Sequence, residues 1–293
     1  MKRAAFSQPL MPVALLLPQL IIIAVFFYWP AGEAIYSSFF LQDPFGFGSN
    51  YVGADNYTRL AKSSEYAKVA GFTLFFTVLV TFLSLGIALL LAVKADKVIR
   101  GAKTYRTLLM WVYAVAPPVA GFLGALLFDQ NIGPITDLFA YFGYNLQIGL
   151  NYNDTAFAMI VVSVWKQIPV NFIFLLSGLQ SIPVAVREAA LIDNKSGTRR
   201  FWDITFPLLA PTAFFLLIIN ITYALFDTFG VIDIMVKGNP ASNPITLVYK
   251  VYTDGFRGSD LGGSSAQSVV LMVLVLALTV MQFRMLERRI HYT

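Results

Sequence analysis

Five long stretches without a single charged residue constrain this chain more than any other feature of its sequence. A helix needs about 20 residues to cross a hydrocarbon core about 30 Å thick, and each stretch is longer than that. Only 13% of the 293 residues are charged, about half the share in a soluble domain. The sequence therefore predicts a polytopic helical membrane protein and excludes a soluble enzyme, a nucleic-acid binder and a disordered chain. The stretches are 4–32, 69–93, 107–128, 204–226 and 261–283.

Six membrane spans are predicted, because a further apolar segment is interrupted only by Lys166. The first is too long for the apolar region of a signal peptide, which has about 7–15 residues, and it ends in the aromatic run Phe26-Phe27-Tyr28-Trp29. It is therefore interpreted as an uncleaved span. The six predicted spans are about 10–32, 70–93, 107–128, 156–180, 208–229 and 267–286.

The distribution of lysine and arginine predicts which side of the membrane each loop occupies. Six spans place both termini on one side, and the segments of that side hold 14 of the 21 basic residues, against 6 on the other side. Cytoplasmic loops carry the excess of basic residues, so both termini are predicted to be cytoplasmic. The fourteen are Lys2, Arg3, Lys94, Lys97, Arg100, Lys103, Arg106, Arg187, Lys195, Arg199, Arg200, Arg284, Arg288 and Arg289.

The residues that most enzymes and metal sites need are missing. The chain has no cysteine, its one histidine is His291, and it contains no phosphate-binding Gly-x-x-x-x-Gly-Lys-Ser/Thr loop and no common catalytic motif. We therefore expect no enzymatic activity, no metal and no cofactor in this chain. If the chain takes part in active transport, a partner protein or an ion gradient has to supply the energy.

Loops and prolines add to the expected architecture. The external segments 33–68, 129–155 and 230–266 are rich in Gly, Asn, Asp, Pro and aromatic residues, and we expect them to fold against the spans as parts of one membrane domain over 1–293. Pro117-Pro118 should kink the third span, since neither residue has an N–H to donate. The kink serves either packing or a hinge for alternating access. Asp227 is expected at the solvated end of span five.

Span four carries a polar stripe in which Ser163, Gln167 and Asn171 recur at every fourth residue, with Lys166 beside them. Two explanations stay open: hydrogen bonding between helices, including those of a partner subunit, or a substrate path. Lys166 would lie about 15 Å deep, half-way through the membrane, where a charge needs a partner. That partner is either an anionic cargo or a structural group, such as a carbonyl freed by Pro169.

The predicted cytoplasmic loop 181–207 has its own local structure. Pro183 suits the first turn of a helix, and Val184 to Asp193 are expected to form a short amphipathic helix that ends before Asn194, a residue that tolerates positive φ. Residues 198–206 should form a second short helix, with Pro207 at the start of span five. Two short helices at a tight turn make a projection suited to docking.

This loop resembles the EAA loop of ABC-importer permeases. Glu188-Ala189-Ala190 and Ile204-Thr205-Phe206-Pro207 match the pattern Glu-Ala-Ala, three residues, Gly, nine residues, Ile-x-Leu-Pro without a gap. Two positions differ: Asn194 replaces the glycine and Phe206 replaces the leucine. The resemblance implies that the loop docks on a cytoplasmic ATPase. Its expected coupling residues are Glu188, Ala189, Ala190, Asp193, Asn194 and Gly197, with the two alanines letting the partner approach closely.

Along nearly the whole chain, the sequence resembles carbohydrate-type importer permeases. Within this group it resembles most the permeases that import glycerol 3-phosphate. The resemblance implies a type I ABC-importer permease fold with a core over about 70–287, in the bacterial inner membrane. The implied partners are a second homologous permease subunit, two ATPase subunits that bind the ATP, and a periplasmic solute-binding protein. The implied cargo is sn-glycerol 3-phosphate or glycerophosphodiesters.

Alternatives remain at this stage. Gly238-Asn239-Pro240 departs from the Gly-Gly-Pro of related sugar permeases, so the cargo could differ, and a neutral sugar or oligosaccharide is the second reading. A different class, a secondary transporter or channel working alone, would leave the EAA loop unexplained.

Overall fold

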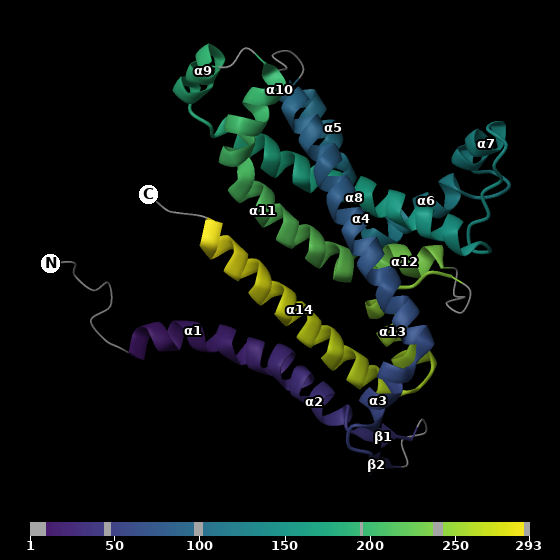
Figure 1. Ribbon diagram of the computed structural model, residues 1–293. Helices are drawn as coiled ribbons and strands as arrows, with labels where there is room; N and C mark the ends of the chain where they lie inside the picture. Colours follow the sequence, from purple (N-terminus) through teal and green to yellow (C-terminus); the bar gives the residue numbers. More distant parts are fainter. Residues whose placement is uncertain (1–9, 44–47, 97–101, 194–195, 237–242, 290–293) are drawn as a thin grey trace. The chain divides into compact units, whose positions relative to one another are not determined.

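The computed structural model describes residues 10–43, 48–96, 102–193, 196–236 and 243–289 (Figure 1). The chain divides into two compact units, each described by itself below. Unit 1 comprises residues 1–63 and 251–274, and unit 2 comprises residues 64–250 and 275–293. The long helix α14 (Leu261–Arg289) begins in unit 1 and continues into unit 2.

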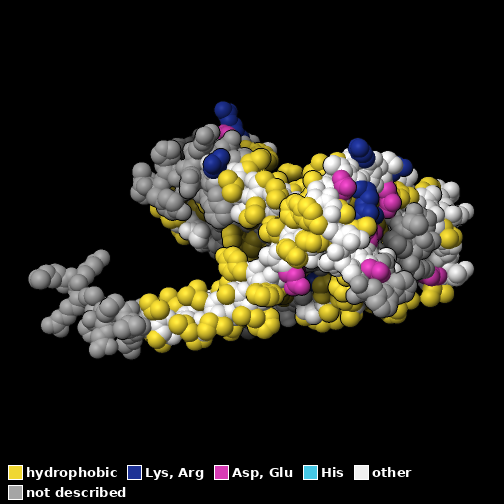
Figure 2. Space-filling model, turned by 90° about the horizontal axis from the view of Figure 1, so that it is seen from below, with side chains coloured by type: hydrophobic (Ala, Val, Ile, Leu, Met, Phe, Trp, Pro, Cys, Tyr) yellow, Lys and Arg dark blue, Asp and Glu magenta, His cyan; other side chains and the backbone are white. Residues whose placement is uncertain are grey.

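Unit 1 begins with one continuous helical segment. It consists of α1 (Leu10–Ile23), the π-helical turn η1 (Ala24–Tyr28) and α2 (Trp29–Ser37). The stretch Val13–Ser37 is long and apolar enough to span a membrane, and none of its most apolar window is buried by the chain. Hydrophobic side chains cover the visible face of this segment in Figure 2. A helix that is apolar all round is suited to a lipid environment.

The rest of unit 1 is a small polar assembly after this helix. Strands β1 (Phe40–Gln42) and β2 (Ser49–Tyr51) pair antiparallel, with Leu41 opposite Asn50. They are followed by α3 (Asp55–Lys62), whose buried Asn56 donates to the carbonyls of Ser38 and Phe40 at 2.9 and 3.1 Å. The π-turn η4 (Thr253–Arg257) precedes α14.

Unit 2 is built around three long helices that correspond to predicted spans two, four and five. They are α4 (Ser64–Ala95), α8 (Tyr152–Gln180) and α11 (Phe206–Thr222), and α4 and α11 both pack against α8. Small residues of α4 face large residues of α8, which lets the two helices approach closely. Their shared core contains Ala88, Ala92, Ala95, Phe172, Leu175, Leu176, Leu179, Leu209 and Leu216.

Predicted span three is broken rather than kinked. Helices α5 (Ala102–Tyr113) and α6 (Pro117–Leu127) meet at an angle of 102°. The two prolines occupy the first helical positions of α6, where a missing N–H costs nothing, and the residue before them, Ala116, is extended with ψ 145°. The prolines therefore start a new helix.

Helix α6 packs backbone to backbone on α12 (Phe229–Met235). A Cβ on Gly121 would lie 3.0 Å from the Cα and the carbonyl oxygen of Val231, and a Cβ on Gly230 would lie 2.9 Å from the ring of Pro118. Only glycine permits such an approach. This contact gives the sharp bend a packing role.

Further elements of unit 2 are α7 (Pro134–Tyr141) and α13 (Leu247–Tyr252), which lie in predicted external segments, and the turn η3 (Tyr223–Asp227) near the end of predicted span five. The N–H of Leu247 donates to Thr73 at 2.9 Å, and Lys250 pairs with Glu65 at 2.8 Å. Both contacts tie α13 to the first part of α4, as expected for loops that fold against the spans.

Among the described residues, five helices are long and apolar enough to span a membrane, or six spans if the bent pair α5–α6 counts as one. Each of the six predicted spans coincides with one of these helices or with the bent pair, although several helix ends lie up to six residues outside the predicted bounds and span five begins much earlier, at Gly197. The cytoplasmic location of both termini stays a prediction.

Candidate functional site

The helix predicted in the loop after span four is α9 (Val184–Asp193), with the predicted ends. Three residues, 181–183, connect it to α8, and the N–H groups of Val186 and Arg187 both donate to the carbonyl of Pro183. Apolar side chains of α9 are exposed, and Ile192 is 84% accessible. An exposed apolar surface of this kind is suited to contact with another protein or with a membrane.

The residues of the EAA pattern differ in the direction they face. Glu188 and Ala189 are exposed, whereas Ala190 is only 3% accessible and is packed inside the chain. Only Ala189 of the two alanines is therefore open to a partner, which differs from the expectation for the pair. Asp193 ends α9, and Asn194 lies outside the described residues. Gly197 begins α10 (Gly197–Arg200), at the same end of unit 2 as α9 (Figure 1).

The second short helix expected over 198–206 is not separate. Helix α10 continues through the π-turn η2 (Phe201–Thr205) into α11, so that one helix runs from Gly197 to Asp227. Pro207 has no N–H to donate to a carbonyl four residues earlier, which would normally interrupt the helix. Here the preceding turn is widened to a π-turn, in which the N–H of Phe206 donates to the carbonyl of Phe201. The wider turn accommodates the proline, so the helix continues.

Arg187, which the sequence reasoning did not select, holds α9 against the chain. Its Nη1 forms an ion pair with Asp96 Oδ2 at 3.2 Å, and its Nη2 donates to the carbonyl of Leu179. Asp96 directly follows α4, and Leu179 lies in the last turn of α8. Arg187 and Asp96 are 91 residues apart, and no local sequence pattern predicts a contact between them. The one available hint was the presence of an arginine on the helix that was expected to dock.

In the polar stripe of span four, Asn171 belongs to a hydrogen-bonded cluster within the chain. Its Nδ2 donates to Ser84 Oγ at 3.1 Å and to Asn220 Oδ1 at 2.9 Å, and Asn220 Nδ2 donates back to Asn171 Oδ1 at 2.7 Å. All three side chains are fully buried. The cluster joins α8 to α4 and α11, so Asn171 forms the helix–helix hydrogen bonds that were one of its two explanations.

The other stripe residues are also buried. The carbonyl of Ser163 accepts from the Tyr223 hydroxyl at 3.1 Å, while Ser163 Oγ has no hydrogen-bond partner among the described residues. Gln167 is buried beside them, and Lys166 is 8% accessible. The stripe therefore points into the body of unit 2.

Lys166 has electrostatic partners on two other elements. Its Nζ lies 5.9 Å from the centre of the Tyr113 ring, at the end of α5, and it is attracted by the carboxylate of Asp227 in η3. The side chain of Asp227 is exposed. Asp227 was expected at the solvated end of span five, and its exposed carboxylate in η3 lies within electrostatic reach of Lys166.

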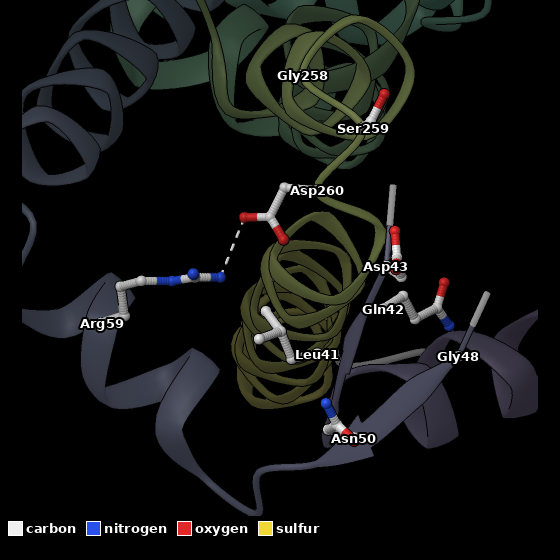
Figure 3. A pocket seen from close by; sticks show the side chains of 9 residues that line it. All are labelled: Leu41, Gln42, Asp43, Gly48, Asn50, Arg59, Gly258, Ser259 and Asp260. Carbon is white, nitrogen blue, oxygen red and sulfur yellow. Dashed lines mark hydrogen bonds and ion pairs between the residues drawn. The ribbon is translucent and has the colours of Figure 1, made fainter. Parts of the chain in front are cut away.

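Unit 1 contains a polar pocket of about 590 Å³ (Figure 3). Figure 3 shows the Asp260 carboxylate directed at Arg59, and the two form an ion pair at 3.0 Å. Asp43 also lines the pocket. With two aspartates and one arginine, the pocket has a formal charge of −1, which opposes the binding of a phosphate. The other lining residues are Leu41, Gln42, Gly48, Asn50, Gly258 and Ser259. Within the described part of the chain, no three acidic or histidine residues gather into a metal site.

The chain belongs to the family of binding-protein-dependent transport system inner membrane components, whose sequence model matches residues 2–292. The helical membrane body with its bent span is therefore that of a transport permease. The chain is a multi-pass component of the inner membrane and a transport protein rather than an enzyme.

Curated relatives match over the full length. The sn-glycerol-3-phosphate transport system permease protein UgpA of Rhizobium meliloti (strain 1021) is 48% identical over 292 residues, with 100% of both chains covered. The protein of the same name from Yersinia pseudotuberculosis serotype I (strain IP32953) is 47% identical over 290 residues, with 99% of each chain covered.

Solved structures share the fold at low sequence identity. A chain of a bacterial ABC transporter involved in the import of the acidic polysaccharide alginate is 20% identical, with a TM-score of 0.82 and 96% of both chains covered. A chain of the alginate transporter in complex with an alginate pentasaccharide-bound periplasmic protein gives a TM-score of 0.83 at 20% identity, covering 95% of this chain and 94% of that one. This likeness establishes the type I ABC-importer permease fold.

Proposed function

We propose that this chain is the membrane-spanning permease subunit of an ATP-driven importer of sn-glycerol 3-phosphate or glycerophosphodiesters. The observation that carries the proposal is identity of 47–48% along the whole chain to permeases named for sn-glycerol 3-phosphate. The chain itself offers no ATP-binding loop, so ATP is bound by partner subunits.

The proposed complex contains a second, homologous permease subunit, two cytoplasmic ATPase subunits and a periplasmic solute-binding protein. Membership of a binding-protein-dependent family supports the last partner. Each permease contributes half of a passage and one docking helix. In this chain the proposed docking helix is α9, with Glu188, Ala189 and the exposed Ile192 toward the ATPase. Asp193, Asn194 and Gly197 are the further coupling residues proposed from the EAA pattern. Closure of the ATPase dimer on ATP would displace α9 and open the passage outward.

We further propose that Lys166 supplies the positive charge that the passage offers to the cargo. A phosphate ester carries about −1.5 to −2 charges at neutral pH, and lysine binds phosphate as a point charge. The carboxylate of Asp227 attracts Lys166 from the end of span five. Ser163 and Gln167 are proposed to line the same path, whereas the amide of Asn171 is engaged in the helix cluster.

The test is reconstitution of the complete complex in liposomes, with the solute-binding protein added at the face predicted to be periplasmic. We expect ATP-dependent uptake of labelled sn-glycerol 3-phosphate and none of maltose. Preferential uptake of maltose would replace the proposed cargo with a neutral sugar. Uptake by this chain alone, driven by an ion gradient without ATP, would refute the importer itself.

The two alanines of the EAA pattern provide a matched pair of variants for the docking of α9. Ala189→Trp adds bulk to an exposed position and is expected to prevent retention of the ATPase subunits while leaving the melting temperature of the permease pair unchanged. Ala190→Trp adds the same bulk at a buried position, where overpacking costs about 1–3 kcal/mol, and is expected to lower the melting temperature. Co-purification and thermal melting in detergent measure both effects. Equal behaviour of the two variants would contradict the orientation of α9.

A further inference from the structure

We propose that the ion pair between Arg187 and Asp96 transmits the movement of α9 to the membrane helices. Arg187 and Asp96 are positioning residues in this inference, and neither is assigned to contact cargo or ATP. The inference rests on the proposed function, in that it presumes that an ATPase displaces α9.

Besides the packing of Ala190, α9 is attached to the membrane helices both along the chain and across space. Along the chain, α9 is joined to α8 by residues 181–183, a short connection about which the helix could pivot. Across space, the guanidinium of Arg187 reaches Asp96 at 3.2 Å and the carbonyl of Leu179. The planar fork of arginine holds two acceptors in a fixed relation, which lysine does not. The second attachment therefore prevents α9 from pivoting independently of α4.

Both acceptors adjoin the packed core of unit 2. Leu179 is a core residue, and Asp96 directly follows Ala95, another core residue of the cluster shared by α4, α8 and α11. Closely packed interiors have low compressibility and pass on a displacement. A movement of α9 would therefore be passed on to α4, α8 and α11 together. These are the helices that carry the hydrogen-bonded Ser84, Asn171 and Asn220.

The ion pair is poorly placed to serve stability alone. The side chains of Arg187 and Asp96 are 39% and 19% accessible, and partly exposed ion pairs add little to stability. Its removal should therefore change the mechanical connection much more than the folding of the subunit, and the two effects can be measured separately.

The central variant is Asp96→Asn, studied in the complete complex in liposomes with cargo-loaded binding protein. We expect the ATPase subunits to stay bound and the melting temperature to stay unchanged, while the ratio of cargo transported to ATP hydrolysed falls about 2- to 30-fold, the range of coupling changes between linked sites. The charge exchange Asp96→Arg with Arg187→Asp should recover a substantial part of that ratio relative to either single change, which a purely structural role would not produce.

Glu65→Gln is the matched control, because it removes the ion pair with Lys250 at the opposite end of the same helix, α4. It should leave the transport-to-hydrolysis ratio unchanged, whatever it does to stability. An unchanged ratio in Asp96→Asn would overturn the inference, and so would an equal fall in Glu65→Gln. Ile192→Glu separates the two proposals: it should release the ATPase subunits, and if it does not, the docking role of α9 fails independently of the ion pair.

Discussion

Lys166→Met is expected to lower ATP-dependent uptake of sn-glycerol 3-phosphate by about 10- to 100-fold. A hydrogen bond to a charged group is worth about 1.5–3 kcal/mol, and each 1.4 kcal/mol is a factor of ten. Methionine keeps an unbranched apolar side chain beside the Tyr113 ring and removes the ammonium group, with its charge and its three N–H donors. Initial rates of uptake in liposomes provide the measurement, with basal ATP hydrolysis and subunit assembly recorded in parallel and expected to persist.

Combining Lys166→Met with Asp227→Asn tests whether the charge of Lys166 binds the cargo or balances Asp227. If Lys166 only balances Asp227, the double variant Lys166→Met with Asp227→Asn restores uptake, because no charge is left without a partner. If Lys166 serves the cargo, the double variant stays as defective as Lys166→Met. Restoration of transport, or failure of Lys166→Met to assemble, would assign the lysine a structural role.

Gly121→Leu is expected to prevent the permease from folding stably. A Cβ at this position already meets the backbone of Val231 at 3.0 Å, and backbone cannot rotate away as a side chain can. Overpacking of a filled interior costs about 1–3 kcal/mol and occasionally more, and the remaining atoms of leucine add to the overlap. The measurements are the yield in the membrane and the melting temperature in detergent.

Gly86→Leu is the control for that substitution. Gly86 lies in α4, in the same kind of apolar helix, but no atom lies within 4 Å of the place where its Cβ would be. The same change should therefore leave yield and melting temperature nearly unaltered. If both leucines were tolerated equally well, the close packing of α6 on α12 would be refuted.

The sequence predicts this fold where the determining forces are local. Uncharged stretches locate the spans, and Pro183 predicts the start of α9 correctly because proline constrains its own backbone and that of its neighbours. The same property of proline led us to predict a kink within one helix at Pro117-Pro118. The structure has a new helix start there, because contacts with α12, far away in the sequence, decide in which direction the chain continues.

The candidate site was predictable to a lesser extent. The EAA pattern selected α9 as the candidate docking helix, but the pattern contains no information on which alanine faces inward, since that depends on the residues across from it. The pairing of Arg187 with Asp96 and the approach of Asp227 to Lys166 both arise from tertiary contacts between distant segments. Periodicity placed Ser163, Gln167 and Asn171 on one face and could not choose between a path and a helix contact.

The cluster of Ser84, Asn171 and Asn220 has a consequence for how the spans find one another during assembly. Apolar helix surfaces in lipid slide past one another at little cost, because lipid tails are as apolar as leucine. Amide groups do not share this freedom, since a displacement by one turn would separate each donor from its acceptor in a medium without water. The 2.7 to 3.1 Å bonds among these three side chains thus favour one longitudinal alignment of α4, α8 and α11. Two asparagines and one serine therefore help to set the register of the bundle.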